Sequence, residues 1–378
     1  MAAYVFWITL ALLVFTYAGY PLLIAMLARL RLRPAGWNPS SAFQPRVKVL
    51  IVAHNEASRI AARVENLLAS DYPPEKLSVL VVSDGSTDDT ADRVRAFENP
   101  RVRVITLPER NGKPAGLNAG VAADDSEIVV FTDARQTFAP DTVAILASRF
   151  ADPQVGAVSG ELEIAAAQSS TGTGMDAYWK LERFLRAREA EWDSCIGCTG
   201  ACYAIRRELF TPLPADTILD DVVVPMRIAI SGYRVLHEPA ARAFDPQALE
   251  PAAEARRKRR TLAGNFQILF RHPSWLIPWR NRLWWQLAAH KYLRLAGPVL
   301  LVGALASTAV LAAHPFYRAA LLLQAAFYLL AGAGMATPLR TPILSLPAGF
   351  VFLNLAVVRA FWHYLTAEAP ARWQTPPK

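Results

Sequence analysis

The chain has 378 residues, of which 53% are hydrophobic, with a mean hydropathy of +0.19 and a formal net charge of +8. This composition excludes a disordered polymer and argues against one soluble domain, because so much apolar surface requires lipid as well as a core. The length suggests about two or three structural units, and the positive charge suits nucleic acid, an anionic membrane surface or a phosphorylated substrate.

Residues 1–33 are predicted to form an N-terminal transmembrane anchor. Residues 2–28 contain no charged side chain, and about 20 apolar residues are enough to cross a bilayer. A cleaved signal peptide would carry positive charge before a shorter apolar run, whereas here Arg29, Arg31 and Arg33 follow the run. We therefore expect an uncleaved anchor with its arginines at the cytoplasmic end and the N-terminus outside.

A polar linker, residues 34–45, is predicted to join the anchor to a domain over residues 46–270. Helix-like stretches such as 57–70 and 88–98 separate apolar runs in this domain, which predicts the order βαβα, a parallel sheet and an α/β fold. The runs are rich in Val and Ile and are predicted to be buried strands at 47–53, 78–83, 102–107 and 127–132.

Polar residues follow three of these strands where each strand ends. His54, Asn55 and Glu56 follow the first strand, Asp84 the second and Asp133 the fourth. Ligands of open parallel sheets bind beyond the carboxyl ends of the strands, so we expect these side chains to share one rim. One such Asp alone would be explained as a turn or a helix cap, but three strand ends together favour a binding site.

Several other functions are disfavoured by the sequence. No GxGxxG follows the first strand and no GxxxxGK[ST] occurs, which counts against dinucleotide-binding dehydrogenases and P-loop enzymes. The basic residues do not alternate with stacking aromatic residues, so no nucleic acid is expected as a partner. The three cysteines lie within Cys195 to Cys202 without a nearby fourth ligand, so we expect reduced packing residues rather than a zinc site.

The C-terminal part is predicted to return to the membrane. Residues 271–293 hold tryptophans among basic residues, and we expect an interfacial segment, the alternative being a loop with core tryptophans. Residues 294–378 are predicted to form a bundle of about three transmembrane helices, which makes four in the chain. Pro347 and Asn354 interrupt the last run, so a re-entrant or surface-lying final segment stays open.

Six motifs stand in order along the middle of the chain: VLIVAHNE at 49–56, VVSDGSTDDT at 81–90, RNGKPAGLNAG at 110–120, FTDAR at 131–135, TGA at 199–201 and LDDVVVP at 219–225. Together they resemble the motifs of the membrane-bound family 2 inverting glycosyltransferases, which include the synthases of cellulose, hyaluronan, chitin and poly-N-acetylglucosamine. The resemblance covers roughly residues 46–300. It implies a cytoplasmic GT-A domain, Rossmann-like with a mostly parallel sheet, flanked by transmembrane helices.

The first motifs imply a site for the donor nucleotide. By the resemblance, Asp84 corresponds to the family's uracil-contacting aspartate. The backbone at Ala53, Asn55 and Glu56 corresponds to its uridine cradle. A UDP-sugar is therefore the expected donor.

The next two motifs imply a site for the donor diphosphate. Lys113 and Asn118 match the family's KxxxLN pattern, and a lysine there suits the charge of the diphosphate. Asp133 falls at the first carboxylate of the DxD motif, which implies Mg²⁺ or Mn²⁺. The second Asp position holds Arg135, so either the ion keeps one protein carboxylate with waters or the guanidinium takes over part of the charge.

The last motifs imply the acceptor side of the site. Asp221 corresponds to the aspartate of the family's TED motif and is the predicted general base, with Asp220 expected to raise its pKa by like-charge repulsion. Thr199 and Gly200 are expected in the acceptor-facing loop, where small residues let a sugar approach the backbone. Arg260 is the one position that survives from the family's QxxRW motif, and it is expected at the acceptor or diphosphate end.

Together these features predict an integral membrane enzyme that transfers a sugar from a UDP-sugar to a hydroxyl of a growing polysaccharide. The expected partners are a glycan or lipid-linked acceptor and membrane lipids, with export partners or an oligomer left open. A single-sugar transferase that makes a glycolipid is one alternative. A catalytically idle scaffold subunit of an export system is another, because Arg135 and the missing Gln and Trp depart from the family pattern. A sugar-nucleotide-forming transferase would leave the membrane spans without a reason.

Overall fold

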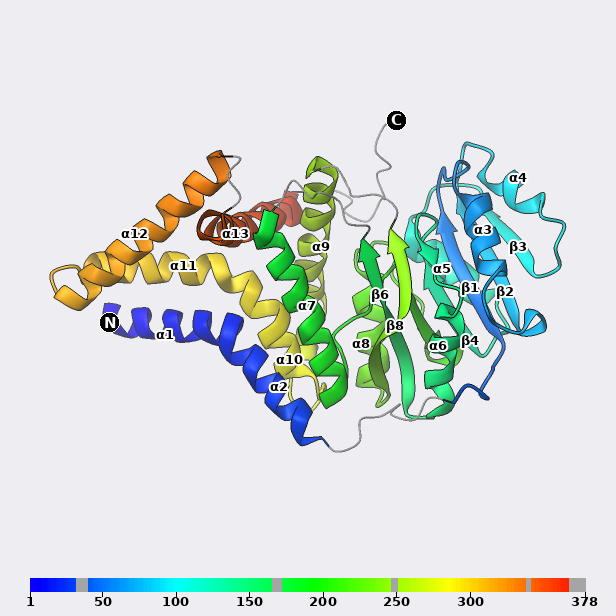
Figure 1. The fold of residues 1–378 in the computed structure, drawn as a ribbon, viewed down its shortest axis with the longest axis horizontal. Coiled ribbons are helices and arrows are strands. Elements are labelled where there is room, and N and C mark those ends of the chain that lie inside the picture. Colours follow the sequence, from blue (N-terminus) through cyan, green and yellow to red (C-terminus); the bar gives the residue numbers. More distant parts are fainter. Residues whose placement is uncertain (32–39, 165–171, 246–250, 338–340, 367–378) are drawn as a thin grey trace. The chain divides into compact units, whose positions relative to one another are not determined.

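A computed structural model describes residues 1–31, 40–164, 172–245, 251–337 and 341–366 of the protein. The chain divides into two compact units. The sheet unit holds the strands and the shorter helices, and the membrane unit holds the N-terminal helix, most of α7 (Gly172–Trp192) and the chain from α9 (Pro251–Arg271) onward (Figure 1). Most of the predicted linker and the C-terminal tail lie outside the described residues.

An eight-stranded sheet forms the centre of the sheet unit within the described residues, in the order β3-β2-β1-β4-β7-β6-β8-β5. The four strands expected from apolar runs are present to within one residue at each end. The strands are β1 (Val47–Ala53), β2 (Leu77–Asp84), β3 (Val102–Leu107), β4 (Ile128–Thr132), β5 (Thr137–Phe138), β6 (Val155–Ile164), β7 (Tyr203–Arg206) and β8 (Arg234–Asp245).

The first half of the sheet is parallel, as predicted. β1 pairs with β2 on one side and with β4 on the other, which brings Ala53 opposite Ser83 and Ile51 opposite Thr132. Every residue of β1 and β4 is buried, which explains why their sequences are continuous apolar runs rather than alternating ones. The carboxyl ends of these strands therefore share one edge of the sheet.

The second half of the sheet was not predicted, and it makes the sheet mixed. β7 is antiparallel to β4 and to β6, β5 is antiparallel to β8, and β6 and β8 are parallel. β6 and β8 carry charged residues such as Glu161 and Arg242 and have no long run of Val or Ile. A search for apolar runs therefore misses them.

Helices flank the strands of the sheet unit. Their bounds are α3 (Ile60–Leu68), α4 (Thr90–Arg95), α5 (Lys113–Ala122), α6 (Thr142–Ser148) and α8 (Asp220–Ile230), with short 3-10 turns at Pro74–Lys76, Arg149–Ala151 and Arg207–Leu209. On α3, Ile60, Val64 and Leu67 are buried at helical spacing and pack into the core of the sheet. Arg63 is buried on the same helix.

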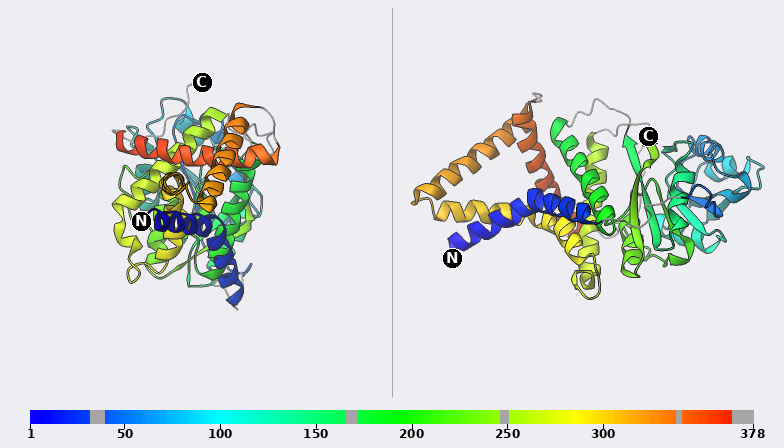
Figure 2. Two further views of the ribbon diagram at one scale, coloured as in Figure 1. Left: turned by 90° about the vertical axis from the view of Figure 1, so that its left-hand side faces the viewer. Right: turned by 60° about the horizontal axis from the view of Figure 1, so that its bottom comes forward.

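Four helices in the described part of the membrane unit are long and apolar enough to cross a bilayer, which agrees with the predicted number. The first runs from Ala2 to Leu30 through α1 (Ala2–Val14), a π-helical turn (Phe15–Gly19) and α2 (Tyr20–Leu30). The others are Trp284–Val310, α12 (Pro315–Ala336) and α13 (Pro342–Thr366). α1 packs against α11 (Leu293–Val310), and the right-hand view of Figure 2 shows the two helices next to each other.

The second spanning helix begins earlier than the predicted boundary at residue 294. It is continuous through α10 (Trp284–Leu287), a π-helical turn (Ala288–Tyr292) and α11. Residues 284–293, expected in the interfacial segment, therefore form its first turns. Trp285 has a protein partner there, because its ring meets that of Tyr20 edge to face at 5.9 Å. Before this helix, a 3-10 turn (Pro273–Leu276) precedes Trp279, which is 84% exposed.

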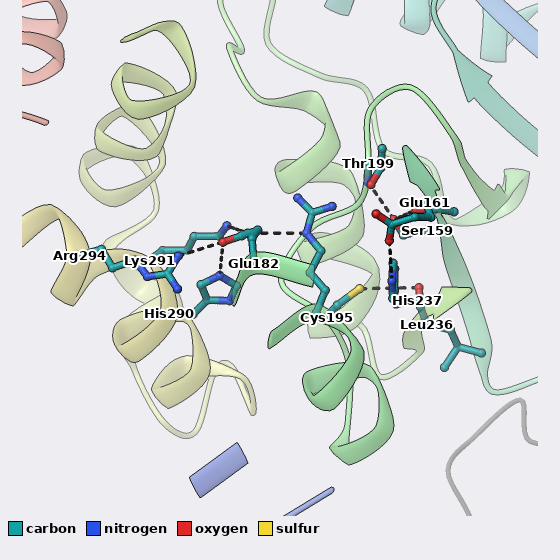
Figure 3. Close-up of polar contacts among 12 residues, drawn as sticks. Ser159, Glu161, Glu182, Cys195, Thr199, Leu236, His237, His290, Lys291 and Arg294 are labelled. Carbon is teal, nitrogen blue, oxygen red and sulfur yellow. Dashed lines mark hydrogen bonds and ion pairs between the residues drawn. The ribbon is translucent and has the colours of Figure 1, made fainter. Parts of the chain in front are cut away.

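A buried carboxylate links α7 to the start of this spanning helix. Glu182 contacts the Nζ of Lys291 at 3.0 Å, the Nε2 of His290 at 3.0 Å and an Nη of Arg294 at 2.9 Å (Figure 3). Burial alone would raise the pKa of Glu182, but Lys291, His290 and Arg294 hold it well below its ordinary value. The cluster fixes α7 within the membrane unit.

Candidate functional site

The loops that follow β1 and β2 brace each other at the shared edge of the sheet. The backbone N–H of Asn55 donates to the Oγ of Ser86 at 3.2 Å, and the N–H of Thr87 donates back to the Oδ1 of Asn55 at 2.8 Å. The N–H of Glu56 donates to the Oγ1 of Thr90 at 2.9 Å. Asn55 has a positive φ of 55°, which asparagine tolerates better than most residues. Ala53, Asn55 and Glu56 thus form a fixed rim.

Asp84 organises the segment that leads into α5. The residue is 3% exposed, and its two carboxylate oxygens accept the backbone N–H groups of Asn111 and Gly112, each at 2.8 Å. Gly85 follows with a φ of +59°, and a Cβ at this position would lie 2.4 Å from the backbone N of Arg110. Only glycine fits there, so the second motif is set by the close approach of two chain segments.

Lys113 lies where three of the motifs meet. Its Nζ is 3.0 Å from the Oδ1 of Asp133 at the end of β4 and 3.6 Å from the Oδ2 of Asp220 on α8. Burial would lower the pKa of Lys113, but the carboxylates of Asp133, Asp220 and Asp221 raise it above its ordinary value. A permanently charged ammonium therefore stands among carboxylates that are far apart in the sequence.

Asp220 and Asp221 form the first turn of α8, directly after Leu219. The TGA loop packs against them: a Cβ at Gly200 would lie 2.9 Å from the Oδ2 of Asp221, and the N–H of Cys198 donates to the carbonyl of Asp221 at 2.7 Å. The structure therefore brings the predicted base and the predicted acceptor loop together. A carboxylate in the first turn of a helix is also a common capping residue, and this position is compatible with a role of Asp221 as base.

A second polar layer supports the acceptor loop. The N–H of Thr199 donates to the Oγ of Ser159 at 2.9 Å, and Glu161 on the same strand pairs with His237 of β8 at 3.1 Å (Figure 3). Ser159, Glu161 and His237 were not predicted as supporting residues, because they lie in strands that have no clear signal in the sequence. The three cysteines of this region are buried and form no disulfide.

Arg135 forms an ion pair with a residue that lies in none of the six motifs. Its Nη2 lies 2.5 Å from the Oδ2 of Asp245 at the end of β8, and the Nε2 of Gln136 approaches the same oxygen at 3.3 Å. The second position of the DxD pattern thus carries an ion pair. Arg135 also lies near the rim, because its charge acts on Glu56, whose pKa is raised mainly by burial.

Asn118 and Arg260 were also predicted for the site. The side-chain amide of Asn118 donates to the carbonyl of Leu213 at 2.8 Å and accepts its N–H at 2.8 Å. Asn118 therefore braces the segment before α8, whereas a contact with the diphosphate was expected. Arg260 lies on α9 in the membrane unit, and its expected role stays a prediction.

The donor set at the end of β4 suits a divalent ion that is held jointly with a substrate. Asp133 offers one partly exposed carboxylate, with 22% of its side chain accessible. No group of three or more His, Cys, Asp or Glu residues in the described chain is arranged to hold a metal by itself. Hard ions such as Mg²⁺ are often bound by one or two carboxylates together with substrate phosphates, so the residues present fit that arrangement.

Comparisons with known proteins point to one family. Residues 48–212 match the family model described as glycosyl transferase family 2. An N-acetylglucosaminyltransferase of Rhizobium meliloti (strain 1021) is 35% identical over 178 residues, which is 45% of this chain and 41% of that protein. A poly-beta-1,6-N-acetyl-D-glucosamine synthase of Staphylococcus aureus (strain COL) is 27% identical over 215 residues, or 52% of this chain and 48% of that protein. The chain spans about half the length of the curated relatives it matches.

One solved structure matches nearly end to end. The mannosyltransferase PcManGT from Pyrobaculum calidifontis, in complex with GDP-Man and Mn²⁺, superimposes with a TM-score of 0.73 at 28% identity. The match covers 96% of this chain and 99% of that chain. The sheet unit therefore has the GT-A fold that the motifs implied, and the likeness includes the helices of the membrane unit.

Proposed function

We propose, on the premise that residues 48–212 are a glycosyl transferase family 2 domain, that this protein is an inverting glycosyltransferase of the membrane. It would transfer a sugar from a nucleoside diphosphate sugar to an acceptor hydroxyl. The observation that carries the proposal is the position of Lys113, whose ammonium stands within 3.0 Å of Asp133 and 3.6 Å of Asp220. The donor-side and acceptor-side motifs thereby meet around one charge.

The proposed reaction needs a single base. Asp221 accepts the proton of the acceptor hydroxyl while the hydroxyl oxygen forms a bond to the anomeric carbon. The bond from that carbon to the donor phosphate breaks on the opposite side, and its electron pair leaves with the nucleoside diphosphate. The first turn of α8 and the TGA loop position Asp221 for this step, because Gly200 has no side chain and the carboxylate of Asp221 occupies the space that a Cβ there would take.

The residues around the diphosphate supply positive charge for its departure. Lys113 would exchange its carboxylate contacts for the phosphate oxygens, and Asp133 would hold a divalent ion together with the same phosphates. Such an ion, when bound, stabilises the negative charge of the leaving group. The Mn²⁺ complex of the matched mannosyltransferase supports this assignment.

Two donors are supported by different observations. Relatives named as N-acetylglucosaminyltransferase and poly-beta-1,6-N-acetyl-D-glucosamine synthase favour a UDP-sugar, the donor expected from the sequence. The end-to-end match to an enzyme solved with GDP-Man favours GDP-mannose. We propose a UDP-sugar as the first donor to test and GDP-mannose as the second.

The four candidate membrane spans bear on the kind of acceptor. Four candidate spans suit an acceptor or product that lives at the bilayer, with the sheet unit on the cytoplasmic side where nucleotide sugars are made. We propose extension of a polysaccharide, with export partners or an oligomer to complete the assembly. Transfer of a single sugar to a lipid-linked acceptor is the second candidate, because this chain has the same extent as the matched mannosyltransferase.

Turnover of each donor by the purified full chain tests the proposal. UDP-GlcNAc, UDP-glucose and GDP-mannose are supplied singly with Mn²⁺ and membrane lipids, and nucleoside diphosphate release is measured with the product lengths. We expect release with one donor, its loss on adding a chelator, and its loss in Asp221→Asn. A ladder of products supports polymerisation, and one discrete product supports a glycolipid. Release of pyrophosphate, or activity that survives in Asp221→Asn, would contradict the proposed reaction.

A further inference from the structure

Arg63 is a buried cation that forms no ion pair in the described part of the chain. It lies on α3 at 2% exposure and is among the largest fully buried side chains of the protein. Arginine is almost never fully buried without a carboxylate partner, since an aliphatic side chain of similar size fills a core at lower cost. The position therefore calls for an explanation beyond packing.

The contacts of Arg63 converge on the end of β4. Its Nη2 donates to the Oγ1 of Thr132 at 2.8 Å, and that hydroxyl donates to the carbonyl of Ala201 at 2.7 Å. Its Nη1 donates to the Oδ1 of Asn66, and the guanidinium lies 4.2 Å from the centroid of the Phe138 ring. One side chain thus ties α3, the last residue of β4, and β5 together.

Asn66 completes this arrangement. Its amide accepts the backbone N–H of Phe138 at 2.8 Å and donates to the carbonyl of Phe138 at 3.0 Å. The chain between Thr132 and Phe138 is therefore held at both ends by α3. Asp133 and Arg135 lie inside this held segment.

The charge of Arg63 also acts on this segment. Burial lowers the pKa of Arg63 to about 9, and the charge of Asp133 acts in the opposite direction, so the guanidinium stays protonated at neutral pH. Cys202 is close by, but burial raises the pKa of its thiol to about 12, so it is neutral. The charge of Asp133 therefore acts on Arg63 without a direct ion pair between them.

We propose that Arg63 is a positioning residue of the donor site, which fixes the segment between β4 and β5 through its contacts with Thr132, Asn66 and Phe138. The inference rests on the proposed function, because it assumes that Asp133 serves a nucleoside diphosphate and its ion. The role differs from that of Lys113, since Arg63 is enclosed by protein and does not reach the substrate. It acts by holding Asp133 and Thr132 in place.

Nucleotide binding separates this role from a structural one. The full chain in detergent is titrated calorimetrically with UDP and with GDP in the presence of Mn²⁺, and its thermal unfolding is recorded. Arg63→Met removes the charge and keeps the length of the side chain. We expect its nucleotide Kd to rise about tenfold while its unfolding temperature stays at or above the wild-type value. Arg63→Lys restores a cation and is expected to lose about threefold or less.

Arg206→Met is the matched control. Arg206 also lies over a phenylalanine ring, 5.5 Å from the centroid of Phe150, and donates to the carbonyls of Val155 and Phe150 at 2.8 Å. Its side chain also donates to the carbonyl of Asp152 at 3.0 Å, and its backbone pairs with Ile128 at the start of β4, at the opposite end of that strand from Thr132. We expect Arg206→Met to lower the unfolding temperature and to leave the nucleotide Kd unchanged.

The outcomes are distinct. The inference is supported if the wild type binds one nucleotide and Arg63→Met binds it about tenfold more weakly. A smaller loss of affinity in Arg63→Lys supports it as well. If Arg63→Met binds nucleotide with the wild-type Kd, Arg63 is a packing residue and the inference is overturned. The same holds if Arg63→Met unfolds at a lower temperature and Arg63→Lys binds nucleotide no more tightly than Arg63→Met. If the wild type binds neither nucleotide, the donor site itself is wrong and the inference falls with it.

Discussion

A methyl group added at Gly200 is expected to slow catalysis with little effect on stability. In Gly200→Ala the new Cβ would lie 2.9 Å from the Oδ2 of Asp221 and 3.4 Å from its Cβ and Cγ. Heavy atoms in contact prefer about 3.5 Å or more, so the carboxylate must move by roughly 0.5 Å. A displacement of about 1 Å at a reacting group costs about a hundredfold, so we expect kcat to fall about tenfold, or roughly 1.4 kcal/mol.

The measurement is nucleoside diphosphate release at saturating acceptor, with thermal unfolding of the same samples. The donor KM should stay unchanged, because the atoms nearest to an added Cβ at Gly200 all belong to Asp221, the proposed base. Stability should change by less than about 0.5 kcal/mol, since the shift falls on the end of one side chain.

Gly232→Ala provides the opposite control. Gly232 has a φ of +106°, and no atom lies within 4 Å of the place that an added Cβ would take, so alanine meets backbone strain and no steric contact. We expect a loss of about 1 kcal/mol in stability with wild-type kcat. Gly200→Ala with full kcat would refute the reasoning that the TGA loop fixes Asp221 for catalysis.

Three further substitutions test individual contacts. Lys113→Met should reduce kcat/KM for the donor about a hundredfold, because it removes a preorganised charge from the diphosphate site, whereas an equal effect on acceptor KM alone would contradict this assignment. Asn118→Ala should lower stability by about 2 kcal/mol in denaturant unfolding, since it removes two hydrogen bonds to Leu213, and a purely kinetic effect would instead favour a contact with substrate. Glu182→Gln should cost about 3 kcal/mol at neutral pH by breaking a buried ionic cluster. Because the pKa of Glu182 is held below its ordinary 4.5, the wild-type advantage should be complete above that pH and decline as the pH falls further, and a constant difference down to acid pH would refute it.

The sequence was sufficient for the first half of the sheet and for the rim of the site. β1, β2 and β4 are buried runs rich in Val and Ile with a polar residue at or directly after their end, and both signals are local. Parallel pairing then places Asp84 and Asp133 at one edge without further information. The four candidate spans were expected for the same reason, because each contains a long apolar segment.

The rest of the site depends on contacts between distant residues. Arg135 reaches Asp245 across 110 positions, and Arg63 reaches Thr132 across 69. Neither Arg63 nor Asp245 has a neighbouring motif that distinguishes it from an ordinary surface charge. β6 and β8 alternate polar and apolar residues weakly, so Glu161 and His237 had no predicted strand to place them. The helix of the second candidate span starts at Trp284, before the apolar run expected from residue 294, because tryptophans such as Trp285 pack on a helix there.

The carboxylate of Asp84 has a consequence for how the enzyme would distinguish its donors. Both of its oxygens hold amides of the residues that come just before Lys113. If a nucleobase binds at Asp84, as the sequence predicts, it would act on the segment Asn111–Gly112 and thereby on the position of Lys113. Exchanging one donor nucleobase for another should then alter the rate of sugar transfer as well as the affinity. Discrimination between donors would therefore be measurable in kcat.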